Sequence, residues 1–373
     1  MSAYKLVSIF FSLALVSTII LSSSANNLVR AESIHIVSTR NHFDHFGNLI
    51  DNKPPYEPFP FNFQNVGCSQ EVVIYTHGIW TARNKVDEGV KHMFESAPEV
   101  FDRARLSLQS MDYTFPIIGF SWDSDTEISK DGWNYAKKIA KENGSKLTQF
   151  IVDLKNNCPQ TKVRLIAHSL GARVVLESLR NLYNNHAWNT NNFKISSVHL
   201  MGAAVDDSEV SKNIADVSSD GIKSAYGKAI EKEVLHFYNL FNLEDDALEP
   251  GFFNPWSFGC FNYQENQPVY YPCFEQDLAL GQKGIQSTIL NADIPQNYND
   301  IHVTQEVLNI RDADADGGCD LMYPSFLSPS GFVCTITQTG DNHLGYLGFR
   351  ATANSIRDNG AMNVIVDTLR NSP

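Results

Sequence analysis

The sequence has little positive charge, no closely spaced cysteine pair and no tract of low complexity. Its 373 residues hold 29 Lys and Arg against 42 Asp and Glu, a formal net charge of −13. Nucleic-acid binding depends on a basic face that displaces counterions, so this balance argues against a nucleic-acid partner. The six cysteines form no CxxC pair, which leaves a zinc ribbon unsupported. The remaining composition, with 43% apolar residues, is that of a globular protein.

A long apolar run occurs only near the start of the chain. Leu6–Leu21 follows a short, positively charged start and precedes Ser-Ser-Ser-Ala at 22–25. This pattern is typical of a secretory signal, so we expect residues 1–25 to be removed and residues 26–373 to be secreted or extracytoplasmic, without a transmembrane span. The alternative is an uncleaved segment that anchors the chain in a membrane. The run of 16 residues is shorter than the ~20 that a spanning helix needs.

Export places the cysteines in an oxidising compartment, where an even number predicts disulfides. The six are Cys68, Cys158, Cys260, Cys273, Cys319 and Cys334. Proximity in sequence pairs the third with the fourth and the fifth with the sixth, which leaves the first for the second. Buried free thiols are the alternative.

Short β-branched or aromatic runs alternate with longer helical patterns. The runs predict strands over residues 71–76, 116–121, 163–167, 195–201 and 234–240, and the patterns predict helices over 86–95, 133–155 and 171–183. Two further amphipathic segments lie around 347–357 and 362–369. Such alternation predicts an α/β fold with a mostly parallel central sheet and helices on both faces.

The stretch over residues 250–335 breaks this rhythm. It is rich in Pro, Gly, Asn and Tyr, contains four of the six cysteines and shows no long helical period. A structureless loop of such length is unusual inside a compact domain. We therefore expect residues 26–373 to be one domain with an irregular, cysteine-rich insertion or cap at about 250–335.

A serine stands where the strand over 163–167 meets the helix over 171–183, in Ala167-His-Ser169-Leu-Gly171. Small residues two positions either side of a serine are typical of a nucleophile elbow, a sharp turn that lifts the hydroxyl above the sheet. The Leu170 N–H then points at a developing oxyanion from the helix N-terminus. Ala167 replaces the usual glycine, which adds one methyl group.

A nucleophilic serine needs a base, an acid that orients the base, and a second oxyanion donor. Three carboxylates follow the strand over 234–240, and among them Asp245 is the preferred acid, with Asp246 as the alternative. His343, between two glycines in a late loop, is the candidate base. The second donor is the Ile79 N–H, which follows His77-Gly78 after the strand over 71–76.

These blocks, in the order Ser169, Asp245, His343, resemble the α/β-hydrolase superfamily over residues 71–248 and from 340 onwards. Gly119-Phe-Ser-Trp122 and Asp341-Asn-His-Leu-Gly-Tyr346 also resemble a poorly characterised microbial branch of it. The resemblance implies acyl-transfer hydrolysis by the serine, without a catalytic cofactor. We therefore expect a secreted carboxylic-ester hydrolase, similar to an esterase or lipase, with a small-molecule or lipid-like acyl substrate.

Other functions stay open at this point. An amidase or peptidase would use the same triad, and a non-catalytic exported binding module with a calcium-stabilised insertion would use none of it. Acyl-chain preference and oligomeric state also stay open, because no sequence pattern bears on them.

A separate acidic motif lies within the predicted insertion. Its spacing places aspartates at positions 1, 3, 5 and 9 of a loop, glycine at 6 and a backbone carbonyl at 7, as in an EF-hand-type Ca²⁺ loop. The predicted ligands are Asp312, Asp314, Asp316, Gly318 and Asp320. Tyr323 stands at position 12, where a bidentate Glu is usual. The expected Ca²⁺ is structural, because Ca²⁺ does not generate a nucleophile near neutral pH as Zn²⁺ does.

Overall fold

The computed structural model divides the chain into two units, residues 1–33 and 34–373, and the described residues belong to the second. They cover 34–82, 96–126, 130–212, 226–248, 279–285, 293–308 and 343–372, apart from residues 45, 67, 246 and 353–354. Four short strands within 261–270, 322–324 and 332–334 are described as well. The predicted signal at 1–25 and the predicted helix over 86–95 lie outside these residues.

Seven parallel strands form the central sheet, in the order β1-β3-β2-β4-β5-β6-β9. They are β1 (His35–Ser38), β2 (Glu71–Thr76), β3 (Ile117–Ser121), β4 (Lys162–His168), β5 (Ile195–Met201), β6 (Val234–Phe241) and β9 (Tyr298–His302). The predicted parallel sheet is confirmed, and all five predicted strands belong to it. Because the strands are parallel, their carboxyl ends meet at one edge, where the loops that follow them lie side by side.

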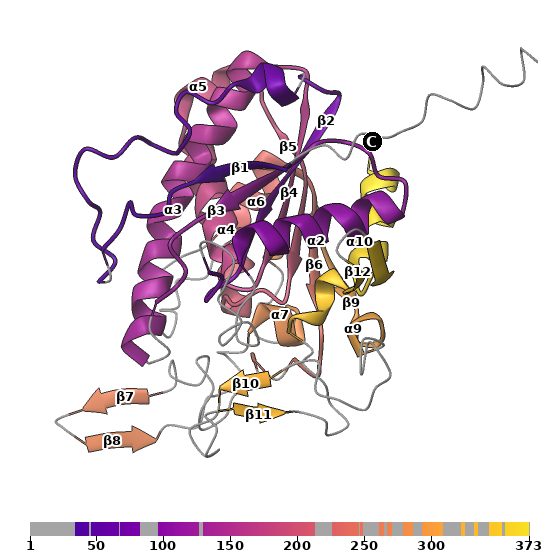
Figure 1. Ribbon diagram of the computed structural model, residues 1–373. Coiled ribbons are helices and arrows are strands. Elements are labelled where there is room, and N and C mark those ends of the chain that lie inside the picture. Colours follow the sequence, from indigo (N-terminus) through magenta and orange to yellow (C-terminus); the bar gives the residue numbers. More distant parts are fainter. Residues whose placement is uncertain are drawn as a thin grey trace, which may run out of the picture. The chain divides into compact units, whose positions relative to one another are not determined.

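Helices cover both faces of the sheet (Figure 1). On one face lie α3 (Lys130–Asn157), α4 (Gly171–Tyr183) and α6 (Gly227–Glu233), and on the other lie α2 (Ala97–Ser110) and α10 (Met362–Asn371). Successive strand residues point to opposite faces. In β2, Val72 and Ile74 therefore join the α3–α4 core, whereas Val73 and Tyr75 join the α2–α10 core. Strands buried on both faces explain why their sequences are nearly continuous apolar runs.

Smaller elements complete the described chain. They are η1 (Phe63–Val66), α5 (His186–Thr190), η2 (Asp207–Val210), β7 (Phe261–Gln264), β8 (Gln267–Tyr270), α7 (Leu280–Lys283), α9 (Thr304–Leu308), β10 (Met322–Pro324), β11 (Phe332–Cys334), η5 (Gly345–Leu347), β12 (Phe349–Thr352) and β13 (Ser355–Asp358). The pairs β7–β8, β10–β11 and β12–β13 are antiparallel.

The amphipathic segment around 347–357 is a hairpin, β12–β13, and its helical period is misleading. Gly348 follows η5 with a φ of +74°, which stops a right-handed helix from continuing. Phe349, Thr352 and Ile356, which follow it, are residues that favour strands. The neighbouring prediction over 362–369 is correct, since α10 occupies it.

The segment over 250–335 contributes one strand to the central sheet, and its pairs β7–β8 and β10–β11 form separate sheets. Its strand β9 pairs in parallel with β6 and ends the sheet on that side. Its short helix α7 lies against the end of β5, where the Gly281 N–H donates to the Ala203 carbonyl at 3.0 Å. Much of the remainder, the predicted Ca²⁺ loop included, lies outside the described residues.

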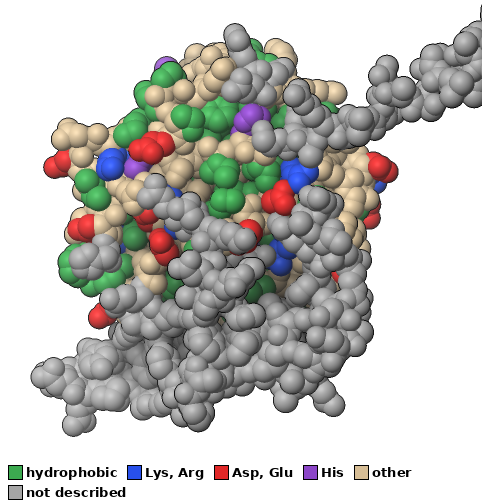
Figure 2. All heavy atoms as spheres, in the orientation of Figure 1, with side chains coloured by type: hydrophobic (Ala, Val, Ile, Leu, Met, Phe, Trp, Pro, Cys, Tyr) green, Lys and Arg blue, Asp and Glu red, His purple; other side chains and the backbone are tan. Residues whose placement is uncertain are grey.

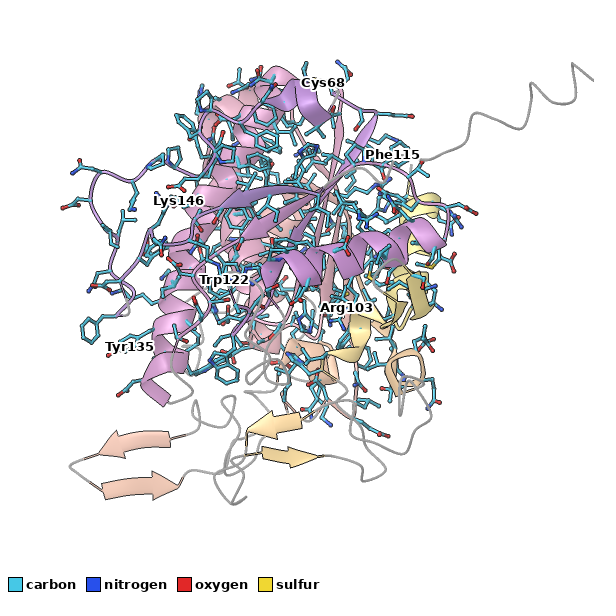
Figure 3. All side chains as sticks on the ribbon, in the orientation of Figure 1. Cys68, Arg103, Phe115, Trp122, Tyr135 and Lys146 are labelled. Carbon is cyan, nitrogen blue, oxygen red and sulfur yellow. A yellow bond between two sulfur atoms is a disulfide. The ribbon has the colours of Figure 1, made fainter. Side chains whose placement is uncertain are left out.

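A disulfide joins Cys68 to Cys158, 90 residues apart in sequence, as predicted. It ties the segment before β2 to the end of α3, at the end of the molecule where the strands begin. Figure 3 shows Cys68 there, well away from Trp122, which follows β3. The side chains of the other four cysteines lie outside the described part of the chain. Within that part, no helix has both the length and the apolar character to cross a membrane.

Acidic and basic side chains are interspersed over the coloured part of the face in Figure 2, with hydrophobic ones between them. The exposed large hydrophobic residues include Phe46, Leu49, Ile50 and Phe59. Scattered apolar side chains of this kind are normal on a protein surface.

Candidate active site

Ser169 lies at the sharp turn between β4 and α4. Its φ of +53° falls in the left-handed region, which a residue with a side chain rarely adopts. The surrounding backbone holds this conformation: the Ser169 N–H donates to the Met201 carbonyl at 2.9 Å, and the Ser169 carbonyl accepts from the Ala204 N–H at 3.2 Å. Met201 is the last residue of β5, the neighbouring strand, and Ala204 follows it. A strained residue that its surroundings hold so firmly is a feature of functional sites.

Two glycines allow the turn to pack so closely. A Cβ atom on Gly171 would lie 2.5 Å from the His77 carbonyl oxygen, so the start of α4 lies directly against the chain that leaves β2. A Cβ on Gly78 would lie 2.8 Å from the Ser169 Cβ. Neither site has room for a methyl group, so the His77-Gly78 segment and the serine turn require glycine at these two points.

His343 and Asp245 form a buried hydrogen-bonded pair. The His343 Nδ1 lies 2.8 Å from Asp245 Oδ2, and the Asp245 carboxylate is fully buried. Its other oxygen, Oδ1, accepts from the Leu248 N–H at 3.2 Å. The acid therefore has a partner for each oxygen, and the pair fixes the plane of the imidazole ring.

His168 connects this pair to the serine turn. Its Nε2–H donates to the His343 backbone carbonyl at 2.6 Å, and the centroids of the two rings are 4.8 Å apart. Burial, followed by the neighbouring His343, holds the pKa of His168 well below its usual range. A neutral His168 with a single proton on Nε2 satisfies this bond. The residue directly before Ser169 thus fastens the segment that carries His343.

Helix α2 supports the same segment from the other side. Ser107 Oγ donates to the Leu347 carbonyl at 2.8 Å, and Arg103 Nη1 donates to the Gly348 carbonyl at 3.3 Å. Both donors are buried. In Figure 3, Arg103 lies on the side of the sheet that faces the viewer, next to the elements that follow His343.

The two predicted oxyanion donors follow neighbouring strands. Ile79 lies in the turn after β2, and Leu170 is the fully buried residue before the first turn of α4. Neither backbone N–H donates to another described residue. Both amides are therefore available, within the described chain, for an external acceptor.

Some predicted residues lie outside the described chain. Asp246, the alternative acid, is one, and the Ca²⁺ ligands Asp312, Asp314, Asp316, Gly318 and Asp320 are the others. Among the residues that are described, no group of three or more His, Cys, Asp or Glu side chains could hold a metal ion. The candidate residues that the structure describes are Ser169, His343 and Asp245, with Ile79 and Leu170 in the turns that follow β2 and β4.

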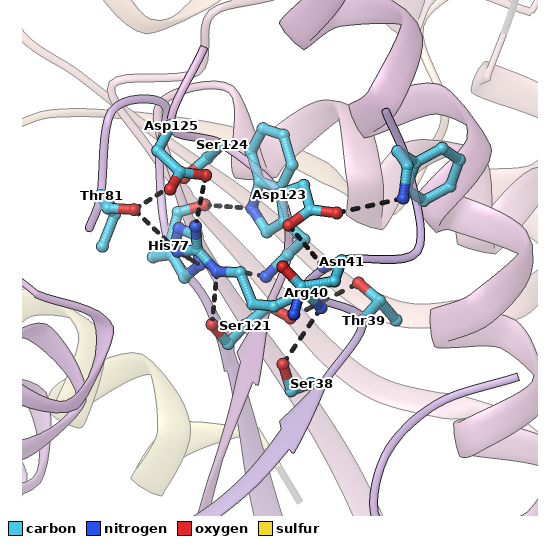
Figure 4. A network of polar contacts seen from close by, with 12 residues as sticks. Ser38, Thr39, Arg40, Asn41, His77, Thr81, Ser121, Asp123, Ser124 and Asp125 are labelled. Carbon is cyan, nitrogen blue, oxygen red and sulfur yellow. Dashed lines mark hydrogen bonds and ion pairs between the residues drawn. The ribbon is translucent and has the colours of Figure 1, made fainter. Parts of the chain in front are cut away.

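One member of the site, Arg40, has no counterpart in the sequence predictions (Figure 4). It follows β1, and its side chain is only 2% exposed. Its Nη2 donates to the Thr81 carbonyl at 2.7 Å and lies 3.2 Å from His77 Nε2. The signal that could have located it is the short, largely apolar stretch Ile34–Val37, with a charged residue three positions after its end.

His77 is the centre of the same network. Its Nδ1–H donates to the Gly78 carbonyl at 2.8 Å, and its Nε2 accepts from the Trp122 N–H at 3.2 Å. Its ring also stacks on Trp122, with an interplanar angle of 7°. Burial, followed by the charge of Arg40, holds the pKa of His77 well below its usual range. The neutral ring therefore keeps one tautomer and fixes the path of the chain into Gly78.

Residues 69–249, just under half of the chain, match the model of a family described as "Alpha/beta hydrolase of unknown function (DUF900)". The matched stretch contains β2 to β6, the serine turn and Asp245. Together with a parallel sheet covered on both faces, this match indicates the fold. The chain has the α/β-hydrolase fold. A search of curated proteins gave no match.

Several solved structures resemble this α/β-hydrolase distantly. A cutinase from Trichoderma reesei, solved with a phosphonate inhibitor, is 20% identical over 38% of this chain and 58% of its own, with a TM-score of 0.24. The catalytic core of a Trichoderma reesei acetyl xylan esterase is 11% identical over 46% and 84% (TM-score 0.28), and Aspergillus fumigatus lipase B is 11% identical over 67% and 48% (TM-score 0.32). The chain thus spans little more than half of the cutinase. Superpositions as loose as these transfer neither a substrate nor a residue role.

Proposed function

We propose that this α/β-hydrolase is a secreted serine hydrolase that cleaves carboxylic esters. Ser169 is the nucleophile, His343 the general base and Asp245 the acid that orients it. The N–H groups of Ile79 and Leu170 bind the oxyanion. The observation that carries the proposal is the buried His343–Asp245 hydrogen bond, fastened through His168 to the strained turn at Ser169.

The proposed reaction has two halves. Ser169 Oγ attacks the acyl carbonyl while His343 takes its proton, and the carbonyl oxygen becomes an oxyanion between the two amides. The oxyanion collapses to an acyl-serine, and His343 passes the proton to the departing alcohol. A water molecule, deprotonated by His343, then attacks the acyl-serine, and His343 returns the proton to Ser169 Oγ as the acid is released. Asp245 stabilises the imidazolium that forms in each half.

A fluorophosphonate probe tests the proposal because it reacts with activated serines. We expect the wild type to be labelled, Ser169→Ala to be unlabelled, and the matched control Ser145→Ala, at an exposed site on α3, to be labelled as the wild type. Labelling that survives in Ser169→Ala would refute the assignment of the nucleophile.

A panel of esters of increasing acyl length and the corresponding amides then separates the substrate classes. An amidase or peptidase uses the same three residues, and it differs by turning over the amides at rates comparable to the esters. Turnover restricted to esters supports the carboxylic-ester hydrolase.

Secretion is part of the same proposal. It is supported by the signal-like start of the chain and by the Cys68–Cys158 disulfide, since disulfides persist in oxidising compartments. Expression of the full chain followed by mass spectrometry of the medium tests it. Protein in the medium that begins near residue 26 is the expected result, and full-length protein confined to membranes is the contrary one.

We also propose that the loop with Asp312, Asp314, Asp316 and Asp320 binds a structural Ca²⁺, on the support of its spacing alone. Four aspartates within nine residues repel one another unless a cation is bound. An ion that binds only the folded state, at about 100 times its Kd, adds about 2.7 kcal/mol of stability. EDTA should therefore lower the melting temperature, and Ca²⁺ should restore it better than Mg²⁺. Identical melting curves and no bound metal by elemental analysis would refute the site.

A further inference from the structure

The turn that carries Ile79 is held at both of its ends by one buried cation. Arg40 Nη2 lies 3.2 Å from the ring of His77, which precedes Gly78, and it donates at 2.7 Å to the carbonyl of Thr81, which ends the turn. Inside the turn, Thr81 Oγ1 donates to the Gly78 carbonyl at 3.2 Å. The guanidinium therefore clamps the stretch in which Ile79 lies (Figure 4).

Arg40 is fixed in turn by the last residue of β3 and the loop after it. Its Nε donates to Ser121 Oγ at 3.0 Å and its Nη1 to Asp125 Oδ1 at 2.9 Å. The same loop holds the turn directly, because the Trp80 N–H donates to the Ser124 carbonyl at 2.8 Å. A planar guanidinium with several donors in fixed directions suits such a junction, whereas a lysine ammonium on a flexible stem does not.

The turn needs this support for a geometric reason. Trp80 has a φ of +56°, so the backbone next to Ile79 is held in an unfavourable conformation. An oxyanion donor acts only when its N–H lies about 2.7–3.1 Å from the position that the charged oxygen will occupy. A relaxed turn would move the Ile79 N–H out of that range without disturbing Ser169, His343 or Asp245.

We propose that Arg40 is a positioning residue for catalysis: through His77 and Thr81 it holds the Ile79 N–H where the oxyanion forms. The inference rests on the proposed function and extends it to a residue outside the stretch that matches the hydrolase family, 69–249. Because the donor acts on the transition state, the loss of Arg40 lowers kcat and leaves KM nearly unchanged.

The test compares an ester with its thionoester, in which sulfur replaces the carbonyl oxygen. Sulfur is the weaker hydrogen-bond acceptor, so the thionoester gains less from the oxyanion donors. In Arg40→Met we expect kcat for the ester to fall by about tenfold or more, since a lost donor costs about 10² to 10³. The ratio of ester to thionoester rates should fall by about fivefold. Arg40→Lys should show the same changes in reduced size.

Arg164→Met and Arg164→Lys are the matched controls. Arg164 is as deeply buried as Arg40, but it lies near the start of β4, five residues before Ser169 and so about 16 Å away. These variants should keep the wild-type ratio. All variants are assayed below their melting temperatures. If a Met variant does not fold, the Lys variant at the same position is used for the comparison instead.

Equal losses for both substrates in the Arg40 variants, or no loss, would overturn the inference. If the wild type is active and depends on Ser169, but the Arg40 variants keep its ester-to-thionoester ratio, only the inference about Arg40 is overturned. A wild type without Ser169-dependent turnover of either substrate overturns the proposed function and the inference together.

Discussion

Arg40 and Arg164 are both almost fully buried, yet they lie at opposite ends of the central sheet and bind different kinds of partner. Near the start of β4, Arg164 pairs with the buried carboxylate of Glu71 at 2.8 Å and donates to the Ser372 carbonyl at 2.7 Å. Arg40 pairs with the half-exposed carboxylate of Asp125 and donates to the Thr81 carbonyl and, at the end of β3, to Ser121 Oγ.

The two partner sets imply different roles. The Arg164 cluster joins β4, β2 and the end of the chain, all of them regular or buried elements, and Glu71 also accepts a hydrogen bond from the buried Tyr113. The loss of either charge would leave the other uncompensated inside the protein. Arg40 contacts the last residue of β3 and the segments that follow β2 and β3, and half-exposed Asp125 can be hydrated. We infer that the amino end of the sheet determines stability and that the carboxyl end determines chemistry.

The largest expected effect tests the carboxyl end. Ser169→Ala should reduce ester turnover by about 10³-fold or more, because the members of a triad act as a unit. It should leave the melting temperature unchanged or slightly higher, since alanine removes a hydroxyl and no described hydrogen bond of the side chain. Steady-state kinetics and thermal melts of the same preparation measure both. A strong loss of stability would contradict the division between the two ends.

The next effect tests the amino end. Arg164→Met should destabilise the protein by about 3 kcal/mol, because the Glu71 carboxylate stays buried without its cation. The turnover per folded molecule should stay within about twofold of the wild type. Urea unfolding gives the first quantity and active-site titration with the probe gives the second. Glu71→Gln is the companion variant, and full stability in both would show that this ion pair is dispensable.

A smaller effect on stability, at His199 in β5, depends on pH. Burial, followed by the charge of Arg164, lowers the pKa of His199 to about 3, and its Nε2 lies 2.8 Å from Thr368 Oγ1. The unfolded side chain titrates near 6.5, so between about pH 3 and 6.5 the unfolded state binds a proton that the folded state does not. The stability associated with neutral His199 is present above pH 6.5 and is lost as the pH falls, at up to ~1.4 kcal/mol per pH unit.

His199→Gln should therefore be less sensitive to acid. Between pH 6.5 and about 4.5 the wild type should lose about 2 kcal/mol more than the variant, measured by urea unfolding at each pH. His186→Gln, at an exposed site on α5, is the control and should follow the wild type. Parallel curves for the wild type and His199→Gln would show that His199 is not kept neutral by folding.

Most of the central sheet could be predicted from sequence because its inner strands, β2 to β5, are buried on both faces. The predicted bounds of β2 and β5 match the structure residue for residue, as do those of α4. β1 was not predicted, since four residues at a sheet edge give too short a pattern. Helix α2 was not predicted either, although Ser96 and Glu99, with a proline between them, are a helix-start signal.

The part of the candidate site that obeys the chain order serine, acid, histidine could be predicted from sequence. The part that depends on contacts between residues far apart in sequence could not. Ser169 and Asp245 follow strand ends and His343 lies in a late loop, in a fixed chain order, and the structure brings Asp245 and His343 into contact. Arg40 could not be found in this way, because its partner Asp125 is 85 residues away in sequence. The Ca²⁺ loop stays a prediction.

The smallest expected effect concerns the start of α2, which lies near the carboxyl end of the sheet but should influence stability alone. The Ser96 N–H donates to Glu99 Oε2 at 3.0 Å, and Ser96 Oγ donates to the same oxygen at 2.8 Å. Ser96 is buried, so Glu99→Ala leaves its N–H without this acceptor, at a loss of about 1 kcal/mol. In a chain of this size that lowers the melting temperature by about 2 °C.

Glu142→Ala, at an exposed position in the middle of α3, is the control and should melt as the wild type. Because α2 supports the His343 segment from Arg103 and Ser107, about two to three turns beyond its start, kcat in Glu99→Ala should stay at the wild-type value. A fall in kcat would show that the start of the helix positions the base, and the division between stability and chemistry would then fail at the carboxyl end.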